Sequence, residues 1–198
     1  MPLWPIVDGS DVSLTSFTDE ELAEELLTRC TGLDVNNPQE TDTPRRYVTA
    51  LKEMTTRTPF DFTVFESNIQ DMVIVRDIPV HSMCRHHVLS FQGRAHIGYI
   101  PEYLMAGLSK LARCVKYHAA ALQTQEELTD EIADDLVDEL KPVGVAVVLE
   151  CTHTCMSIRG VQAPGALTYT AAMRGVFMDH DKTAKQEFMA RINTNGRH

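Results

Sequence analysis

The chain has 198 residues, of which 43% are hydrophobic and 23% are charged, and its formal net charge is −10 at pH 7. This length and composition predict one folded globular core and exclude a disordered chain. The acidic balance argues against nonspecific nucleic-acid binding, since proteins that neutralise many phosphates carry a basic surface. Any anionic substrate must therefore meet a local basic cluster.

Hydropathy and cysteine usage predict the compartment. No stretch offers the roughly twenty uninterrupted apolar residues of a membrane helix, and the first ten residues lack a basic start with an apolar signal core. We therefore expect a cytoplasmic protein without a membrane partner. The cysteines are odd in number and lack the spacing of a small disulfide scaffold, so we expect reduced thiols. They are Cys30, Cys84, Cys114, Cys151 and Cys155.

The first part of the chain predicts an arm and two helices. Residues 1–17 mix proline, glycine and hydroxyl residues, which is typical of an arm that is disordered or laid against a partner subunit. Thr18 and Glu21 have the spacing of a capping box and predict a helix over residues 19–30. A second helix is expected to begin at Thr43, because the following proline is tolerated in a first turn, and to end before Pro59.

The middle of the chain predicts two strands and then two helices. A β-branched run indicates a strand over Met72–Ile78, and a second strand is expected over Arg94–Ile100. Apolar residues at helical spacing predict one long helix over Leu104–Leu122. Thr124–Glu127 repeats the capping-box pattern and begins the next helix, which Pro142 ends.

The last third predicts two more strands and a final helix. Val143–Leu149 is almost continuously apolar, as in a strand buried on both faces, and Leu167–Met178 is expected to form another strand. A last helix is expected to begin near Asp181. The predicted fold class is α+β, with N-terminal helices followed by an antiparallel sheet that a helix pair interrupts. Such a sheet has open edges, which helices or other subunits must close.

Two separated Cys/His clusters predict a metal site. Cys84 and His87 stand three residues apart, a spacing that directs a thiolate and an imidazole at one ion, and zinc suits these ligands. If the later cluster is extended, Cys151, His153 and Cys155 point to the same side.

These ligands allow an open or a closed site. A catalytic zinc usually keeps three protein ligands and leaves one position for water. Cys84, His87 and Cys155 would form such an open site, and His86 and His153 would then be free to move protons, unless they are themselves ligands or buried structural histidines. If Cys151 fills the fourth position instead, the site is closed and without catalysis.

Four motifs in chain order resemble those of the GTP cyclohydrolase I family. They are Cys84-Arg85-His86-His87, Gly93–Pro101, Gly107–Arg113 and His153–Val161. With Thr43-Pro44-Arg45-Arg46 near the start, the resemblance covers roughly residues 18–192. Four ordered motifs are far more specific than any one of them.

This resemblance implies a fold and an assembly. The family has a tunnelling fold and assembles as a toroidal decamer of two pentameric rings with active sites between subunits, which would close the sheet edges. The chain would then be an arm at 1–17 and a single domain at 18–198, divided into a helical part at 18–60 and a catalytic part at 61–198. The implied partners are GTP as substrate and further copies of the chain, without nucleic acid.

The resemblance also assigns the site residues. It places the ligands of one Zn2+ per subunit on Cys84, His87 and Cys155, and the proton-transfer histidines on His86 and His153. It places the guanine-anchoring acid on Glu126, preceded by Gln125, and the triphosphate contacts on Lys110, Arg113 and Arg159, with Ser109 nearby. Read without the family, Glu126 is a carboxylate favoured at a helix start.

The implied reaction opens the imidazole ring of GTP by hydrolysis, releases formate and yields 7,8-dihydroneopterin triphosphate. The chain departs from the family pattern at Arg85, which replaces an acid after the zinc cysteine, at Glu127, where arginine is common, and at Ala171-Ala172, which replace hydroxyl residues. Two alternatives remain open here. One is a related enzyme that stops at a ring-opened intermediate or uses another metal, and the other is a non-catalytic zinc module whose closed site includes Cys151.

Overall fold

The computed structural model of the chain describes residues 16–178 and 183–193. Most of the expected N-terminal arm and the expected helix start near Asp181 lie outside these residues. The chain divides into two compact units, Met1–Glu53 and Met54–His198. No helix in the described ranges is both long enough and apolar enough to cross a membrane.

The first unit contains helix α1 (Asp19–Thr31) and most of α2 (Thr43–Thr55). The capping box is confirmed, since the Thr18 hydroxyl accepts from the Glu21 amide at 3.2 Å and the Glu21 carboxylate accepts from the Thr18 amide at 2.8 Å. Helix α1 ends at Gly32, whose φ of 76° is the left-handed conformation that glycine adopts without strain. Helix α2 begins where the sequence predicts and ends at Thr55, before Pro59.

The second unit is built on a five-stranded sheet of order β5-β2-β3-β6-β7. Strands β2, β3, β6 and β7 pair antiparallel, and the short β5 joins β2 in parallel. A separate antiparallel pair joins β1 and β4. The strands are β1 (Val64–Glu66), β2 (Val73–Cys84), β3 (Leu89–Ile100), β4 (Leu104–Ala106), β5 (Leu122–Gln123), β6 (Gly144–His153) and β7 (Thr168–Gly175).

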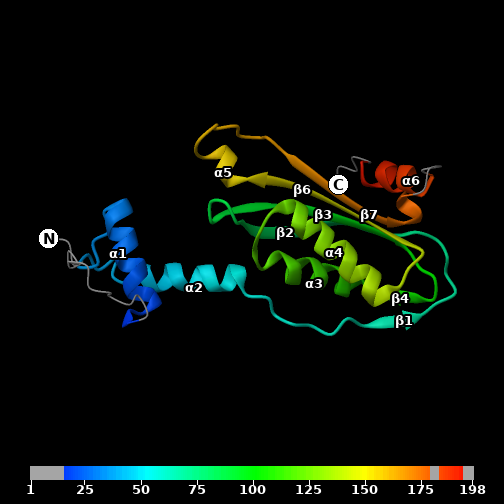
Figure 1. The fold of residues 1–198 in the computed structure, drawn as a ribbon, viewed down its shortest axis with the longest axis horizontal. Helices are drawn as coiled ribbons and strands as arrows, with labels where there is room; N and C mark the ends of the chain where they lie inside the picture. Colours follow the sequence, from blue (N-terminus) through cyan, green and yellow to red (C-terminus); the bar gives the residue numbers. More distant parts are fainter. Residues whose placement is uncertain (1–15, 179–182, 194–198) are drawn as a thin grey trace. The chain divides into compact units, whose positions relative to one another are not determined.

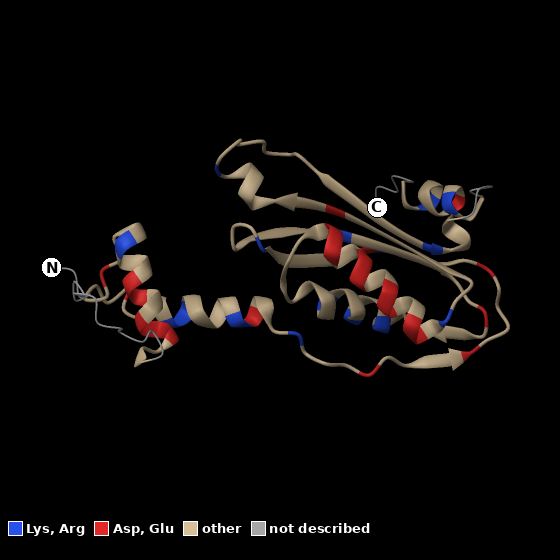
Figure 2. Cartoon of the chain, in the orientation of Figure 1, with Lys and Arg blue, Asp and Glu red and all other residues tan. Residues whose placement is uncertain are grey.

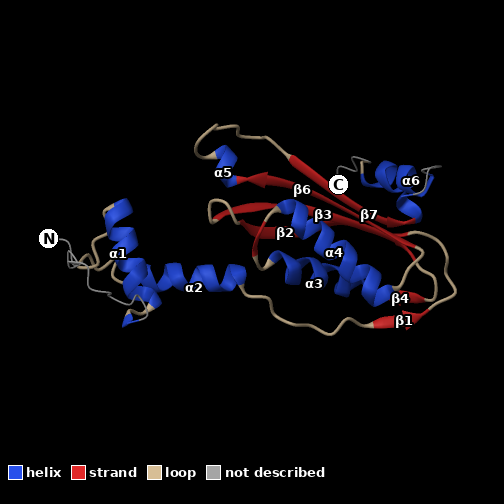
Figure 3. Ribbon diagram, viewed as in Figure 1, coloured by secondary structure: helices blue, strands red, loops and turns tan. Residues whose placement is uncertain are grey.

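Helices α3 (Leu108–Ala119) and α4 (Gln125–Leu140) pack on one face of this sheet (Figures 1 and 3). Their apolar stripes meet β2, β6 and β7 in the main core, where Val80, Phe91, Leu111, Leu136 and Leu149 have no exposed surface. On the opposite face, Phe188 of helix α6 (Thr183–Ile192) packs on Ala146 and Val148 of β6 in a second apolar cluster. Strand β6 is thus buried on both faces, as its continuous apolar run predicts.

The α+β fold with an antiparallel sheet and an interrupting helix pair is therefore confirmed. The long helix expected over Leu104–Leu122 is wrong, because its ends are the strands β4 and β5 and only the middle is helical. The ends pair with other strands through their backbones, a tertiary interaction that overrides the helical spacing of their leucines. The capping box at Thr124 is confirmed, and α4 ends at Leu140, with Lys141 capping its C-terminus before Pro142.

Strands β2 and β3 are longer than the sequence predicts, at 12 residues each. The added part of β2 carries an alternating signal, since Val80 and Ser82 are buried while Pro79 and His81 are exposed. The β-branched run stops before this part, so the run alone gives too short a strand. As a result Cys84 is the last residue of β2 and does not lie on a loop.

Candidate metal centre and active site

The turn between β2 and β3 brings one cysteine and two histidines together. The Cys84 carbonyl accepts hydrogen bonds from the amides of His87 at 3.3 Å and Val88 at 2.9 Å, and Val88 has a positive φ of 52°. This tight turn places Nδ1 of His86 and Nδ1 of His87 each 3.9 Å from the Cys84 Sγ. The spacing of three residues therefore does direct a thiol and an imidazole at one point.

Cys155 reaches the same point from the end of β6. Strand β6 ends at His153, and Thr154–Ser157 forms the single helical turn α5, which Thr154 ties to β3 by donating to the Ser90 carbonyl at 2.6 Å. The ligand atoms of Cys84, His87 and Cys155 all lie within 4.8 Å of one another and could hold a metal ion. Burial raises the pKa of the Cys155 thiol, and the Cys84 sulfur beside it raises it further.

The condition that the segment from Cys151 to Cys155 is extended is not met. The helical turn α5 interrupts the alternation after His153, so Cys155 reaches the cluster by a change of backbone direction. Cys151 has no exposed surface and lies in the main core, and burial raises the pKa of its thiol to about 12. It does not belong to the metal-ligand group found in the described residues, which gives no support to a closed site that includes Cys151.

His153 is held in a fixed orientation beside this cluster. Its ring stacks on Phe91, with centroids 4.7 Å apart and planes 12° apart, and its Nε2 lies 2.9 Å from the Gln125 Oε1. The Gln125 amide nitrogen donates to the carbonyls of Leu149 at 3.3 Å and Thr168 at 3.0 Å. The Gln125 oxygen must therefore accept, so Nε2 of His153 carries a proton and Nδ1 presents a lone pair.

Gln125 and Glu126 occupy different environments at the start of α4. Gln125 is only 1% exposed, and its side-chain oxygen and nitrogen both form hydrogen bonds within the protein. The structure therefore places Gln125 on the buried side of His153. Glu126 is exposed, and its charge opposes the burial that lowers the pKa of His153. The sequence motif marks both residues as site residues, but only burial distinguishes the one that supports a histidine from the one open to a ligand.

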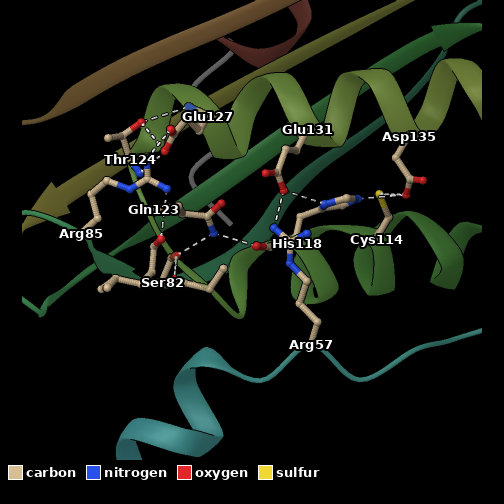
Figure 4. A network of polar contacts seen from close by, with 12 residues as sticks. Arg57, Ser82, Arg85, Cys114, His118, Gln123, Thr124, Glu127, Glu131 and Asp135 are labelled. Carbon is tan, nitrogen blue, oxygen red and sulfur yellow. Dashed lines mark hydrogen bonds and ion pairs between the residues drawn. The ribbon is translucent and has the colours of Figure 1, made fainter.

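The two charged departures from the family pattern contact each other. Arg85 Nη1 lies 2.6 Å from Glu127 Oε1, and a second nitrogen of Arg85 donates to the Leu122 carbonyl at 3.4 Å (Figure 4). Hydrogen bonds from the Thr124 backbone and then its hydroxyl, together with the charge of Arg85, lower the pKa of Glu127. The sequence carries no signal for this pair, because its members are 42 positions apart.

Of the predicted basic residues, Arg113 and Arg159 are exposed and Lys110 is half-buried, and they do not all lie near the cysteines. Burial raises the pKa of the Cys155 thiol and the charge of Arg159 opposes this shift, so Arg159 acts electrostatically on the cluster. Ser109 and Lys110 lie in the first turn of α3. Strand β5, which pairs with Cys84, follows the other end of this helix. Ten residues of helix separate Ser109 from Ala119, or about 15 Å of rise. The Lys110 ammonium donates to the Asp61 carbonyl at 2.6 Å.

Comparison with known proteins gives one consistent result. The sequence model of the family described as GTP cyclohydrolase I matches residues 20–193. The chain is 47% identical over 163 residues to GTP cyclohydrolase 1 of Hydrogenobaculum sp. (strain Y04AAS1), covering 81% of this chain and 89% of the relative. It is 45% identical over 186 residues to GTP cyclohydrolase 1 2 of Nostoc sp. (strain PCC 7120), covering 90% and 86%. It is 48% identical over 165 residues to GTP cyclohydrolase 1 of Saccharomyces cerevisiae, covering 80% and 67%.

Proposed function

Since the chain belongs to the GTP cyclohydrolase I family, we propose that it opens the imidazole ring of GTP by hydrolysis, releases formate and forms 7,8-dihydroneopterin triphosphate. The observation that carries this proposal is the convergence of Cys84, His87 and Cys155 beside an oriented His153. The two thiols and the imidazole converge from the ends of two separate strands. Reactive groups are often placed in this way, on chain segments that a rigid scaffold positions.

The donor set fits one Zn2+ per chain. Two sulfurs and one imidazole nitrogen, all within 4.8 Å, match the ligands of an open zinc site. Such an ion supplies a hydroxide near neutral pH by lowering the pKa of a bound water. Within this group Cys84 is buried in the main core, while the His87 side chain is exposed.

His153 is the residue best placed to move a proton. Its Nε2–H is committed to Gln125, so its Nδ1 lone pair is available to accept and return a proton. Ring opening requires a proton at the departing purine nitrogen, and hydrolysis of the resulting formamide requires a second transfer. His86, also close to the Cys84 sulfur, is the proposed partner in these transfers.

Glu126 and the basic residues account for recognition of GTP. A carboxylate accepts two hydrogen bonds from the N1–H and exocyclic amine of guanine, a donor pair that adenine lacks. Glu126 is exposed at the start of α4 and acts electrostatically on His153, which suits this role. Lys110, Arg113 and Arg159 provide the positive charge that an acidic protein needs to bind a triphosphate.

The separation along α3 supports a site shared between subunits. Along α3, Ser109 lies about 15 Å of helical rise, and Arg113 about 9 Å, from the end of the helix that leads to β5 and Cys84. A neighbouring copy would bring its own α3 residues to the triphosphate. Strand β7 is an edge of the sheet and exposes Tyr169, which a partner strand could cover. We therefore include a homo-oligomer, the decamer of the family, in the proposed function.

The test is incubation of the purified protein with GTP while formate and a fluorescent pterin are measured. We expect both products from the native chain, and a loss of about 10²- to 10⁴-fold in His153→Ala, with the metal content unchanged. The matched control is Cys30→Ala, which alters an exposed thiol outside the metal-ligand group. Absence of formate from the metal-loaded native protein would refute the activity, and loss of metal from His153→Ala would make that histidine a ligand.

A further inference from the structure

A second group of metal-ligand side chains lies between helices α3 and α4. Cys114 and His118 are four residues apart on α3, and Glu131 and Asp135 are four residues apart on α4, so each pair shares one face of its helix. The two helices pack together, and Figure 4 shows the four side chains meeting between them. Figure 2 shows that α4 carries acidic residues along its length, among which only Glu131 and Asp135 contact His118.

Three of these side chains converge on one point. Asp135 Oδ2 lies 3.0 Å from His118 Nε2 and 3.3 Å from Cys114 Sγ, and the three ligand atoms all lie within 4.8 Å of one another. A tetrahedral zinc ion with bonds of about 2.0–2.3 Å separates its ligand atoms by roughly 3.3–3.8 Å. The group therefore has nearly the spacing of such a site before any ion enters.

Glu131 holds the imidazole in the orientation that a metal ligand needs. Its Oε2 lies 3.1 Å from His118 Nδ1, and Arg57 pairs with the same carboxylate oxygen. Histidine ligands almost always donate their second ring N–H to a carboxylate or carbonyl in this way. A neutral ring that donates from Nδ1 to Glu131 directs its Nε2 lone pair at the space between Cys114 and Asp135.

We propose that Cys114, His118 and Asp135 bind a second divalent metal ion, of the zinc class, which links α3 to α4. Thiol, imidazole and carboxylate together are ligands that zinc accepts and that Mg2+ or Ca2+ do not select. Cys114 has no exposed surface and His118 is 8% exposed, so the site is built into the helix interface. Asp135 also lines an open cavity of about 190 Å³, which gives an ion a route in and leaves room for a water as fourth ligand.

The charges of the surroundings suit an ion of charge +2. The His118 ring lies between the carboxylates of Glu131 and Asp135, and the Cys114 sulfur contacts Asp135. A bound ion would draw its compensating charge from Asp135 and the Cys114 sulfur, while Arg57 pairs with Glu131. This site is separate from the proposed catalytic group and does not depend on turnover of GTP.

The test counts zinc in proteins purified from zinc-supplemented cells after gel filtration. We expect about two zinc ions per chain in the native protein, about one in Cys84→Ala, about one in Cys114→Ala and none in the double variant. Cys151→Ala is the matched control, because it removes an equally buried thiol that belongs to neither group, and it should keep the native metal content.

Cobalt provides a readout that does not depend on counting. In apo Cys84→Ala, added Co2+ should give a thiolate-to-cobalt charge-transfer band, which Cys84→Ala/Cys114→Ala lacks. A metal-free Cys84→Ala protein without that band would overturn the proposal, and this result holds even if Cys114 variants fail to fold. One zinc per chain in Cys84→Ala, together with an inactive native protein, would instead support the second site while refuting the cyclohydrolase activity.

Discussion

Replacement of Gln125 by leucine tests whether this buried residue orients His153. Leucine has a similar volume but no polar atoms, so Gln125→Leu removes the acceptor of the His153 Nε2–H and the donor to the carbonyls of Leu149 and Thr168. Each buried group left without a partner costs roughly 1–3 kcal/mol. The contact with Leu149 is long at 3.3 Å, and Thr170 keeps its hydroxyl partner at 2.6 Å, which reduces the total. We expect a loss of about 2–4 kcal/mol in the free energy of unfolding.

The control for this change is a second buried glutamine on the same segment. Gln123 is 2% exposed and donates to the Ser82 hydroxyl at 3.1 Å and the His118 carbonyl at 2.7 Å, but it has no contact with His153. Gln123→Leu should therefore also lower stability, by a similar amount. Only Gln125→Leu should reduce turnover, because only this change removes the hydrogen bond that fixes the orientation and tautomer of the His153 imidazole.

The assay combines thermal unfolding with pterin formation per folded, metal-loaded enzyme at several pH values. We expect turnover of Gln125→Leu to fall by about 10- to 100-fold, part of the contribution of a general acid–base residue, because His153 loses its fixed orientation, and its pH profile to change shape. Zinc content should remain that of the native protein. Equal turnover of Gln125→Leu and Gln123→Leu, after correction for the folded fraction, would refute a positioning role for Gln125.

Two further predictions concern charge. Arg85→Glu should lower the midpoint of urea unfolding slightly, because it sets two carboxylates together. Glu127→Arg also removes the carboxylate of the capping box, so Arg85→Glu/Glu127→Arg should be more stable than the sum of the two single changes but should not reach the native midpoint. Purely additive effects in this double-mutant cycle would show that the pair does not interact. Burial lowers the pKa of His96, whose Nδ1 accepts from the Asp77 amide at 3.3 Å. As the pH falls, His96 is therefore protonated in the unfolded chain at a higher pH than in the folded chain. The free energy of unfolding should fall as the pH drops below about 6.5. His96→Gln should flatten this dependence in urea titrations from pH 8 to 5, whereas a change of the exposed His81 to Gln should not.

The contact between Arg85 and Glu127 changes how the departures from the family pattern are understood. Taken singly, each substitution reverses a charge near the proposed metal site. Together they form one ion pair in this chain, anchored on the backbone through Leu122 and Thr124. Glu127 thus takes part in the capping box of α4 and in this pair at once, so its carboxylate links the turn after Cys84 to the start of the helix that carries Glu126.

Local features of this protein follow from the sequence alone, because they depend on residues a few positions apart. The capping boxes at Thr18 and Thr124 place the starts of α1 and α4, since the contacts that form them span three residues. The convergence of Cys84 and His87 likewise needs only one tight turn. The continuous apolar run of β6 predicts a strand covered on both faces, which the two apolar clusters confirm.

Tertiary structure decides the features that depend on distant residues. The apolar pattern after Pro101 suits one helix, but backbone pairing with β1 and β2 converts its ends into β4 and β5. Cys155 joins the metal-ligand group and Cys151 does not, because α5 redirects the chain after the register of β6 with β3 has buried Cys151. The grouping of Cys114 and His118 with Asp135 arises only when α3 packs on α4. Spacing within a segment determines which side chains share a face, and only packing determines what that face meets.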